Sequence, residues 1–247
     1  MSETVISLEN ILLKFPKKQG LFAFIAGLVK SNKKFHTALS NISLEIHKGE
    51  IIGIIGTNGC GKSTLLRVIS GIYPPDEGEC RVKGNISLLA GLGTGFSSHQ
   101  TGRENAILYA SILGYSEDKI RDKLPEIVEF SELGEFIDEP IRTYSAGMKA
   151  RLGLAVASAI QPEILLIDEV LGVGDPTFKE KSTNRIMEMV EEAGTVVIVS
   201  HSFGMLSKIC DRIVLMEKGE IILLGNPDEA IRTYYERAKK GKLEENE

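Results

Sequence analysis

A glycine-rich segment at residues 56–64 carries a lysine followed by two hydroxyl residues. It reads GTNGCGKST and fits the spacing G-x-x-x-x-G-K-[ST]. Glycines let a backbone wrap around phosphate oxygens, and the N-terminus of a following helix favours negative charge. Lys62 can then reach the outer phosphates of a nucleotide, and the Ser63 hydroxyl can coordinate Mg²⁺. We therefore expect a phosphate-binding loop, the alternative being a strand-to-helix turn with a chance lysine. The residues expected to bind nucleotide here are Gly56, Thr57, Asn58, Gly59, Cys60, Gly61, Lys62, Ser63 and Thr64.

Two acids follow the apolar run 164–167, which reads ILLI. A carboxylate at the carboxyl end of a parallel strand lies where ligands bind in open α/β sheets. We expect Asp168 to hold Mg²⁺, directly or through water, and Glu169 to orient or deprotonate an attacking water. The alternative is a pair of acids that caps the next helix.

His201 follows another buried run, 196–200, which reads VVIVS. Because this is the next expected strand after the one that carries Glu169, we expect His201 to contact the γ-phosphate; the alternative is a structural histidine. The spacing gives His36, His47 and His99 no role.

Ser145 stands before an apolar helical stretch, 152–160, in the sequence YSAGM. Serine is a preferred helix N-cap, and N–H groups at such a turn can bind an anion. Spacing alone does not say which anion this would be.

The elements that position these residues alternate between buried strands and helices. Runs that are apolar on both faces are typical of central strands covered by helices. The expected strands are 51–55, 164–167, 196–200 and 213–216, and the expected helices between them include 62–70, 176–192 and 203–209. This order predicts an α/β core with a largely parallel sheet.

Other segments depart from this rhythm. Residues 41–46 alternate apolar and polar side chains, and the turn at 74–78 precedes another short strand pair, so we expect an antiparallel β edge layer. Residues 101–142 favour an inserted helical subdomain, with helices at 104–113 and 117–130. An amphipathic helix is expected at 228–240, and packing or a dimer contact is the role its pattern favours.

The composition is that of a folded domain, with 43% hydrophobic and 26% charged residues among 247. A formal net charge of -5 gives no overall positive field, and we expect no nucleic-acid partner. The three cysteines share no ligand-like spacing, which favours reduced cytosolic thiols. The N-terminus lacks a signal-peptide pattern, and the longest apolar run, 21–29, is about half of the ~20 residues a spanning helix needs.

Taken in order, the glycine loop, YSAGM, ILLIDE, Gly174-Asp175 and Ser200-His201 resemble the nucleotide-binding subunit of an ABC transporter, over nearly the whole chain. The resemblance implies a P-loop NTPase fold of the ABC type with an antiparallel β edge layer and an inserted helical subdomain. It implies one ABC ATPase domain, 1–240, and a frayed tail, 241–247. Its expected parts are a RecA-like core at about 1–100 and 160–225, a helical subdomain at about 101–159 and a C-terminal helix at 227–240.

The same resemblance implies cofactors and partners. ATP and Mg²⁺ would be bound, and Ser145, Ala146 and Gly147 would contact the γ-phosphate of ATP held by the opposite subunit of a head-to-tail homodimer. Asp175 would lie in the loop that joins the two sites. Phe15 would stack on adenine, with Phe35 as the alternative. A separate transmembrane permease would bring the subunit to the cytoplasmic side of the membrane.

A narrower resemblance rests on TGREN at 101–105, LGTGF at 92–96, and DEVLGVGD at 168–175 with Phe178. Together they are similar to the ATPases that export teichoic acids, O-antigens and capsules. The sequence departs from the general ABC pattern in having YSAGM in place of LSGGQ. It also has Gly91 where many relatives have a glutamine that contacts Mg²⁺ and water; Gln100 lies further on.

Several alternatives stay open. The same catalytic residues would serve an importer or a small-molecule exporter, a soluble ABC-type ATPase that acts on DNA or ribosomes, or a non-hydrolysing regulatory subunit. The insertion at 16–34 is an apolar run flanked by lysines, which fits either contact with a membrane or transmembrane partner, or a short helix packed on the core. The sequence does not choose between teichoic acid and O-antigen.

Overall fold

The structure is a computed structural model that describes residues 3–16, 35–169 and 176–244. The chain divides into two compact units. The first unit comprises Met1–Lys48, Ile52–Lys83 and Ser202–Glu247, and the second comprises Gly49–Ile51 and Gly84–His201. The helical segment expected at 101–159 therefore groups with three strands of the second unit.

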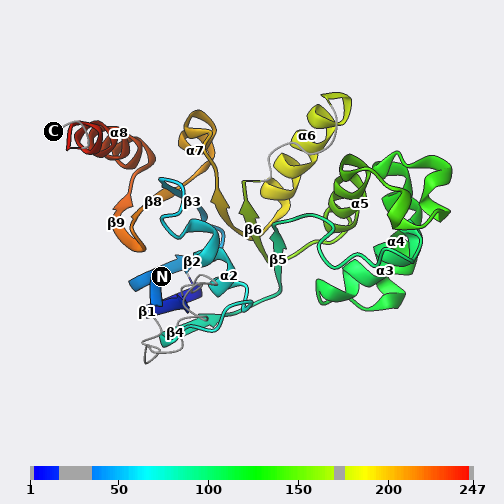
Figure 1. Cartoon of the computed structure of the whole chain (residues 1–247), viewed down its shortest axis with the longest axis horizontal. Helices are drawn as coiled ribbons and strands as arrows, with labels where there is room; N and C mark the ends of the chain where they lie inside the picture. The colour runs from blue at the N-terminus through cyan, green and yellow to red at the C-terminus, as the bar shows by residue number, and fades with distance from the viewer. Residues whose placement is uncertain (1–2, 17–34, 170–175, 245–247) are drawn as a thin grey trace, which may run out of the picture. The chain divides into compact units, whose positions relative to one another are not determined.

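An antiparallel sheet in the first unit has the order β2-β1-β4 (Figure 1). β1 spans Thr4–Pro16, β2 spans Phe35–His47 and β4 spans Glu77–Val82. Alternate side chains of β2, among them Leu39, Ile42 and Leu44, are buried, which confirms the predicted half-exposed strand.

The phosphate-loop candidate lies in the same unit, between β3 (Ile51–Gly56) and α2 (Lys62–Ile69). β3 pairs in parallel with β8 (Arg212–Glu217), and β8 turns back into the antiparallel strand β9 (Glu220–Gly225). Two further helices belong to this unit, α7 (Phe203–Ile209) and α8 (Pro227–Glu244).

Three parallel strands run through the second unit in the order β5-β6-β7. They are β5 (Ile86–Leu89), β6 (Ile164–Asp168) and β7 (Thr195–Val199), and α6 (Pro176–Glu192) connects the last two. All five residues of β7 and the first four of β6 are buried, as expected for strands covered on both faces.

The rest of the second unit is helical. It contains α3 (Gly102–Ile112), α4 (Glu117–Ser131), the short 3-10 helices η1 (Gly134–Asp138) and η2 (Ile141–Thr143), and α5 (Ala146–Ser158). Figure 1 shows α3, α4 and α5 packed together. Their shared core is apolar and includes Tyr109, Ile127, Ile141 and Leu152.

The structure confirms the four predicted strands and corrects two expectations about neighbouring segments. The strands after the turn at 74–78 are not a pair: β4 joins the antiparallel sheet, whereas β5 pairs in parallel with β6. Gly84 separates them at a φ of +114°, a conformation that lets the chain change direction between two sheets. α8 runs to Glu244, four residues into the segment expected to fray, and residues 245–247 lie outside the described residues.

Among the helices that the structure describes, none is both long and apolar enough to cross a bilayer. The apolar run at 21–29 lies outside the described residues.

Candidate nucleotide-binding site

Neighbouring backbone leaves no room for a side chain at two glycines of the glycine loop, Gly56 and Gly61. A Cβ on Gly56 would overlap the carbonyl oxygen of Met216 in β8. A Cβ on Gly61 would lie 2.8 Å from the carbonyl oxygen of Ala38, and Gly61 has a φ of +110°, which favours glycine. The carbonyl of Cys60 in turn accepts a hydrogen bond from the Gly219 amide at 2.9 Å. The loop is therefore held by β2 and by the β8–β9 turn.

Lys62 is buried at the start of α2, with 7% of its surface exposed. Its Nζ donates to the carbonyl oxygens of Gly56 at 2.8 Å and of Thr57 at 3.1 Å. These partners are neutral, so the positive charge is solvated only by dipoles, and an anion at this place would complement it. The first helical turn carries no acid, and its N-cap, Gly61, makes no side-chain hydrogen bond. Backbone N–H groups of the first turn are thus suited to phosphate oxygens.

Cys60 lies in the same loop and is buried. Burial raises the pKa of its thiol, and the nearby charge of Lys62 only partly opposes this. The thiol is therefore neutral near pH 7, where it packs rather than reacts. All three cysteines of the chain are free, and burial raises the pKa of Cys210 to about 12.

The second unit brings together the two residues predicted to be catalytic. β6 and β7 run side by side with Asp168 opposite Val199, so Glu169 and His201 emerge from adjacent strand ends. The Oε1 of Glu169 lies 3.6 Å from the Nε2 of His201, and both side chains reach solvent. The Glu169 amide donates to the Val199 carbonyl at 3.0 Å.

Glu169 has a left-handed backbone conformation, with a φ of +55°. Non-glycine residues rarely adopt this conformation, and such strain concentrates at functional sites. The hydrogen bond to Val199 holds the main chain there, which sets the direction of the Cα–Cβ bond of Glu169.

The described carboxylates suit Mg²⁺ that is bound together with a nucleotide rather than in a cage of side chains. Within the described part of the chain, no group of three or more His, Cys, Asp or Glu residues could hold a metal ion. Mg²⁺ commonly takes one or two carboxylates together with phosphates and water. The Ser63 hydroxyl of the first unit and the Asp168 carboxylate of the second are each oxygen donors of the kind that Mg²⁺ binds.

The YSAGM segment caps α5, as its sequence predicts. The Ser145 hydroxyl accepts a hydrogen bond from the Met148 amide at 3.1 Å. Ser145 and Ala146 are exposed, and Gly147 is half-buried. An open cavity of about 330 Å³ borders this helix start. It is lined by Glu132, Leu133, Phe136, Ser145, Gly147, Met148 and Arg151.

An ion-pair cluster beside this cavity escaped sequence reasoning. Glu132 pairs with Lys181 of α6 at 2.6 Å and with Arg151 of α5 at 3.6 Å. Phe178 is buried beneath them, with the Arg151 guanidinium 4.6 Å from its ring centre and Phe130 edge-on at 5.7 Å. The cluster ties the ends of α4, α5 and α6 together. Glu132, which ends α4 in a left-handed conformation, is the residue that the two basic partners share.

The two segments that carried the narrower resemblance, LGTGF and TGREN, are each held by close contacts: TGREN to the residues just after LGTGF, and LGTGF to α5. The Asn105 amide is completely buried, donates to the carbonyls of Ser97, Gln100 and Thr101, and accepts from the Ser97 amide. A Cβ on Gly153 of α5 would lie 2.7 Å from the Gly93 nitrogen, so helix and loop touch backbone to backbone. Gly91 begins this loop at a φ of +60°.

Both candidates for adenine stacking lie where β1 and β2 pair. Phe15 is half-buried and packs edge-on against Tyr73 at 5.4 Å, whereas Phe35 is 54% exposed. Residues 17–34 of the insertion expected at 16–34 lie outside the described residues, as does the 170–175 segment, which includes Asp175.

A family model described as ABC transporter matches residues 39–172, which is more than half of the chain. The chain belongs to the ABC transporter family. The matched part of this ABC protein begins in β2, ends just beyond β6, and contains the glycine loop, the start of α5 and the paired acids.

Curated relatives extend the match beyond that model. The O-antigen export system ATP-binding protein RfbB of Klebsiella pneumoniae is 39% identical over 94% of the chain and 98% of its own length. The protein of the same name from Myxococcus xanthus is 46% identical over 81% of the chain, but the chain spans only 46% of that relative. The teichoic acids export ATP-binding protein TagH of Listeria innocua is 42% identical over 92% of the chain and 66% of its own length.

Solved structures show the fold of the ABC ATPase. A dimeric ATP-binding cassette in a post-hydrolysis state, bound to ADP and Pi, aligns with a TM-score of 0.68 at 23% identity, over 90% of the chain and 98% of its own length. An ATP-binding subunit of an ABC transporter aligns with a TM-score of 0.69 at 21% identity, over 94% of the chain and 93% of its own length. The predicted P-loop fold of the ABC type is thereby confirmed.

Proposed function

We propose that this chain is the ATP-binding and ATP-hydrolysing subunit of an ABC transporter that exports a lipid-linked polysaccharide, either teichoic acid or O-antigen. The observation that carries the proposal is the alignment with the Klebsiella O-antigen export protein over nearly the full length of both chains. The teichoic acid export protein of Listeria innocua, at 42% identity, supports the same class of substrate. The subunit acts at the cytoplasmic side of the membrane, beside a separate transmembrane permease.

The loop of the first unit binds the phosphates. Residues 56–64 surround them with backbone N–H groups, and Lys62 exchanges its two carbonyl partners for phosphate oxygens. Ser63 and Asp168 coordinate Mg²⁺. Phe15 stacks on adenine from the end of β1, where Phe35 is the alternative. Bound Mg-ATP supplies the phosphoryl group that is transferred to water.

Glu169 acts as the general base and His201 steadies the γ-phosphate and the attacking water. A carboxylate 3.6 Å from an imidazole nitrogen can share a water molecule or a proton with it. The left-handed backbone at Glu169 sets the direction of its Cα–Cβ bond, and the side chain then lies beside His201 without further movement of the main chain.

Two copies assemble head to tail around two ATP molecules. Ser145, Ala146 and Gly147 of one copy contact the γ-phosphate held by the other, at the start of a 13-residue helix whose dipole favours the anion. ATP then acts as the link between copies, because it binds the closed dimer better than the open one. The helices between Arg103 and Phe130 transmit this closure to the permease.

Affinity purification from detergent-solubilised native membranes tests this purpose. We expect a six-helix membrane protein, encoded beside sugar-polymer enzymes, to copurify with the chain and to stimulate its ATPase activity when both are reconstituted with the lipid-linked polymer. Glu169→Gln is the matched control, since it should retain the partner and lose the stimulated hydrolysis. Recovery of only soluble partners, such as ribosomes or DNA-repair proteins, would refute the exporter while leaving the ATPase chemistry intact.

A further inference from the structure

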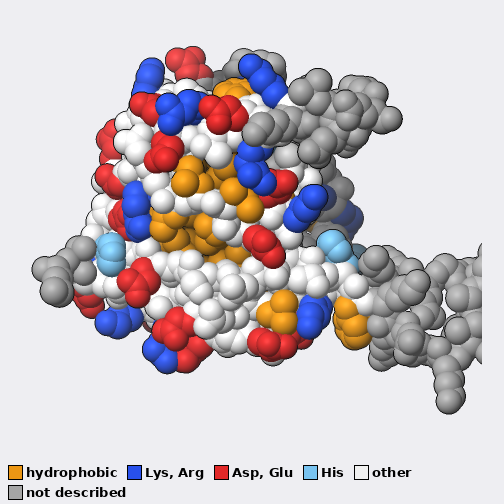
Figure 2. Space-filling model, turned by 90° about the vertical axis from the view of Figure 1, so that its left-hand side faces the viewer, with side chains coloured by type: hydrophobic (Ala, Val, Ile, Leu, Met, Phe, Trp, Pro, Cys, Tyr) orange, Lys and Arg blue, Asp and Glu red, His pale blue; other side chains and the backbone are white. Residues whose placement is uncertain are grey.

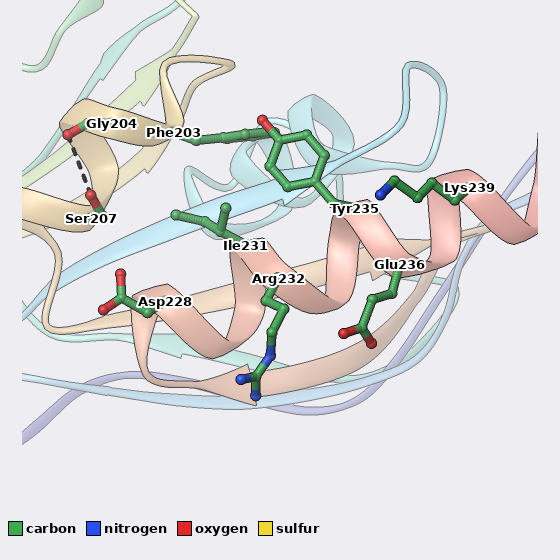
Figure 3. A pocket seen from close by; sticks show the side chains of 9 residues that line it. All are labelled: Phe203, Gly204, Ser207, Asp228, Ile231, Arg232, Tyr235, Glu236 and Lys239. Atoms are coloured by element: carbon green, nitrogen blue, oxygen red, sulfur yellow. Dashed lines mark hydrogen bonds between the residues drawn. The ribbon is translucent and has the colours of Figure 1, made fainter.

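An open groove runs along α8 in the first unit, between this helix and α7 (Figure 3). Its volume is about 550 Å³. The apolar part of its lining comes from Phe203, Ile231 and Tyr235. Phe203 packs edge-on against Tyr234 at 5.0 Å and Tyr235 at 5.6 Å, so the three rings form one aromatic cluster at the joint of the two helices. None of the ATP-site candidates lines this groove.

The apolar surface here is open to solvent. Tyr235 is 52% exposed, and Ile222 and Leu224 of the neighbouring strand β9 are each 36% exposed. Figure 2 shows hydrophobic side chains gathered on the face of the molecule that carries α8 and β9, with charged side chains around them. An apolar patch rimmed by charges is typical of a protein contact surface.

The charged residues that line the groove alternate in sign along α8. They are Asp228, Arg232, Glu236 and Lys239. Spacings of four, four and three residues keep them along the groove side of the helix. In the part of the chain that the structure describes, none of the four forms an ion pair, although Arg237 of the same helix pairs with Glu217 at 2.7 Å. The groove therefore offers a row of charges that no other described residue of the chain pairs at ion-pair distance.

This row is complementary to itself when it is reversed. Read from either end, its signs are opposite: minus, plus, minus, plus in one direction and plus, minus, plus, minus in the other. A second α8 laid antiparallel places Arg232 against the partner subunit's Glu236, and Asp228 against the partner subunit's Lys239. A two-fold axis repeats both contacts, which is the self-complementarity that an isologous interface requires.

We propose that this groove is the interface with a second copy of this chain, in which two α8 helices pair antiparallel across a two-fold axis. The Tyr235 rings and the aromatic cluster fill the apolar centre, and the four charge contacts fix the register. This contact needs no nucleotide, and it is independent of the proposed ATP-linked assembly. It would keep two subunits associated while ATP is absent.

Charge reversal and charge exchange test the register. Glu236→Arg sets Arg against Arg at two symmetric places and should weaken self-association, measured by sedimentation without nucleotide, by roughly tenfold or more. Arg232→Glu should do the same. The double variant with both changes restores opposite charges and should regain wild-type association. Glu229→Arg, which changes net charge equally but lies outside the groove lining, should leave it unchanged.

A zero-length carbodiimide cross-link tests the direction of pairing. Asp228 and Lys239 lie eleven residues apart in one helix, or about 16 Å along its axis, too far for a direct amide bond within one chain. A cross-linked peptide containing both residues must therefore join two copies. We expect this product in the wild type, and its loss in Lys239→Gln.

A wild-type chain that stays monomeric up to about millimolar concentration without nucleotide would overturn the proposal. So would a double charge-exchange variant that associates no better than either single one, or a groove protected by another protein with no Asp228–Lys239 cross-link. Lys62→Ala separates this contact from the proposed ATPase function, because it should weaken nucleotide binding and keep the α8 contact.

Discussion

Two helices of this protein begin at candidate phosphate contacts, and their N-termini are built in opposite ways. α2 starts after Gly61, without a side-chain cap, and carries the buried Lys62 in its first turn. α5 starts at the exposed Ser145, whose hydroxyl already accepts the Met148 amide. The α2 end has no side-chain cap for its first backbone N–H groups, whereas at the α5 end the Ser145 hydroxyl satisfies one of them.

This difference indicates where nucleotide affinity resides. At the α2 end the N-cap, Gly61, makes no side-chain hydrogen bond and the first turn carries no acid, so we expect a single chain to bind ATP there. The α5 end has one fewer free backbone N–H group for a ligand, because the Ser145 hydroxyl already accepts the Met148 amide. We therefore expect the first unit to set affinity, and the YSAGM segment to add contacts only when two copies meet.

The largest expected effect removes the chemistry and leaves both helix ends intact. Glu169→Gln keeps the size of the side chain and loses its basicity, so the hydrolysis rate should fall by about 10²–10⁴-fold. ATP binding should persist, and a nucleotide-linked dimer should accumulate in size-exclusion chromatography with ATP. Turnover at the wild-type rate would exclude Glu169 as the base.

Lys62→Ala removes the one buried charge at the α2 end. Hydrogen bonds to charged groups contribute about 1.5–3 kcal/mol, so ATP affinity measured by calorimetry should fall by roughly 10- to 100-fold. Lys149→Ala is the control at the other helix end, since Lys149 is half-buried in the first turn of α5. Equal losses in the two variants would contradict the assignment of affinity to the first unit.

Gly56→Ala tests whether the loop itself is as constrained as its contacts indicate. The added methyl group overlaps the Met216 carbonyl, and overpacking of this kind costs about 1–3 kcal/mol. Gly59→Ala should cost less, because a Cβ there meets nothing within 4 Å and only its φ of +79° opposes the change. Urea denaturation compares the two, and a larger loss for Gly59→Ala would show that strain, not crowding, dominates.

The smallest effects should come from the capped helices. Ser145→Ala removes the α5 cap, and Thr101→Ala breaks the capping box that Thr101 forms with Glu104 at the start of α3. Each should cost about 1 kcal/mol in the free energy of unfolding. Only Ser145→Ala should also slow ATP hydrolysis, and it should do so most at low protein concentration. An equal effect of both variants on hydrolysis would reduce the role of Ser145 to that of a cap.

The sequence predicts elements whose own residues carry the pattern, and it misses those that depend on contacts between distant segments. β3, β6, β7 and β8 were predictable because burial on both faces leaves unbroken apolar runs, and the glycine loop and the acids follow such strands directly. β5 was assigned to the wrong sheet because four residues carry no pairing information of their own. The Glu132 cluster was missed because its partners, Arg151 and Lys181, come from separate helices and meet only after folding.

The approach of Gly153 to Gly93 has a mechanical consequence. Where two elements meet through long side chains, rotamer changes can absorb a small displacement of one of them. Here the α5 backbone contacts the backbone of the LGTGF segment (92–96) directly, and packed main chain is nearly incompressible. Any shift of α5 along this contact therefore moves residues 92–96 by nearly the same distance, because no flexible side chain lies between the two backbones to absorb it.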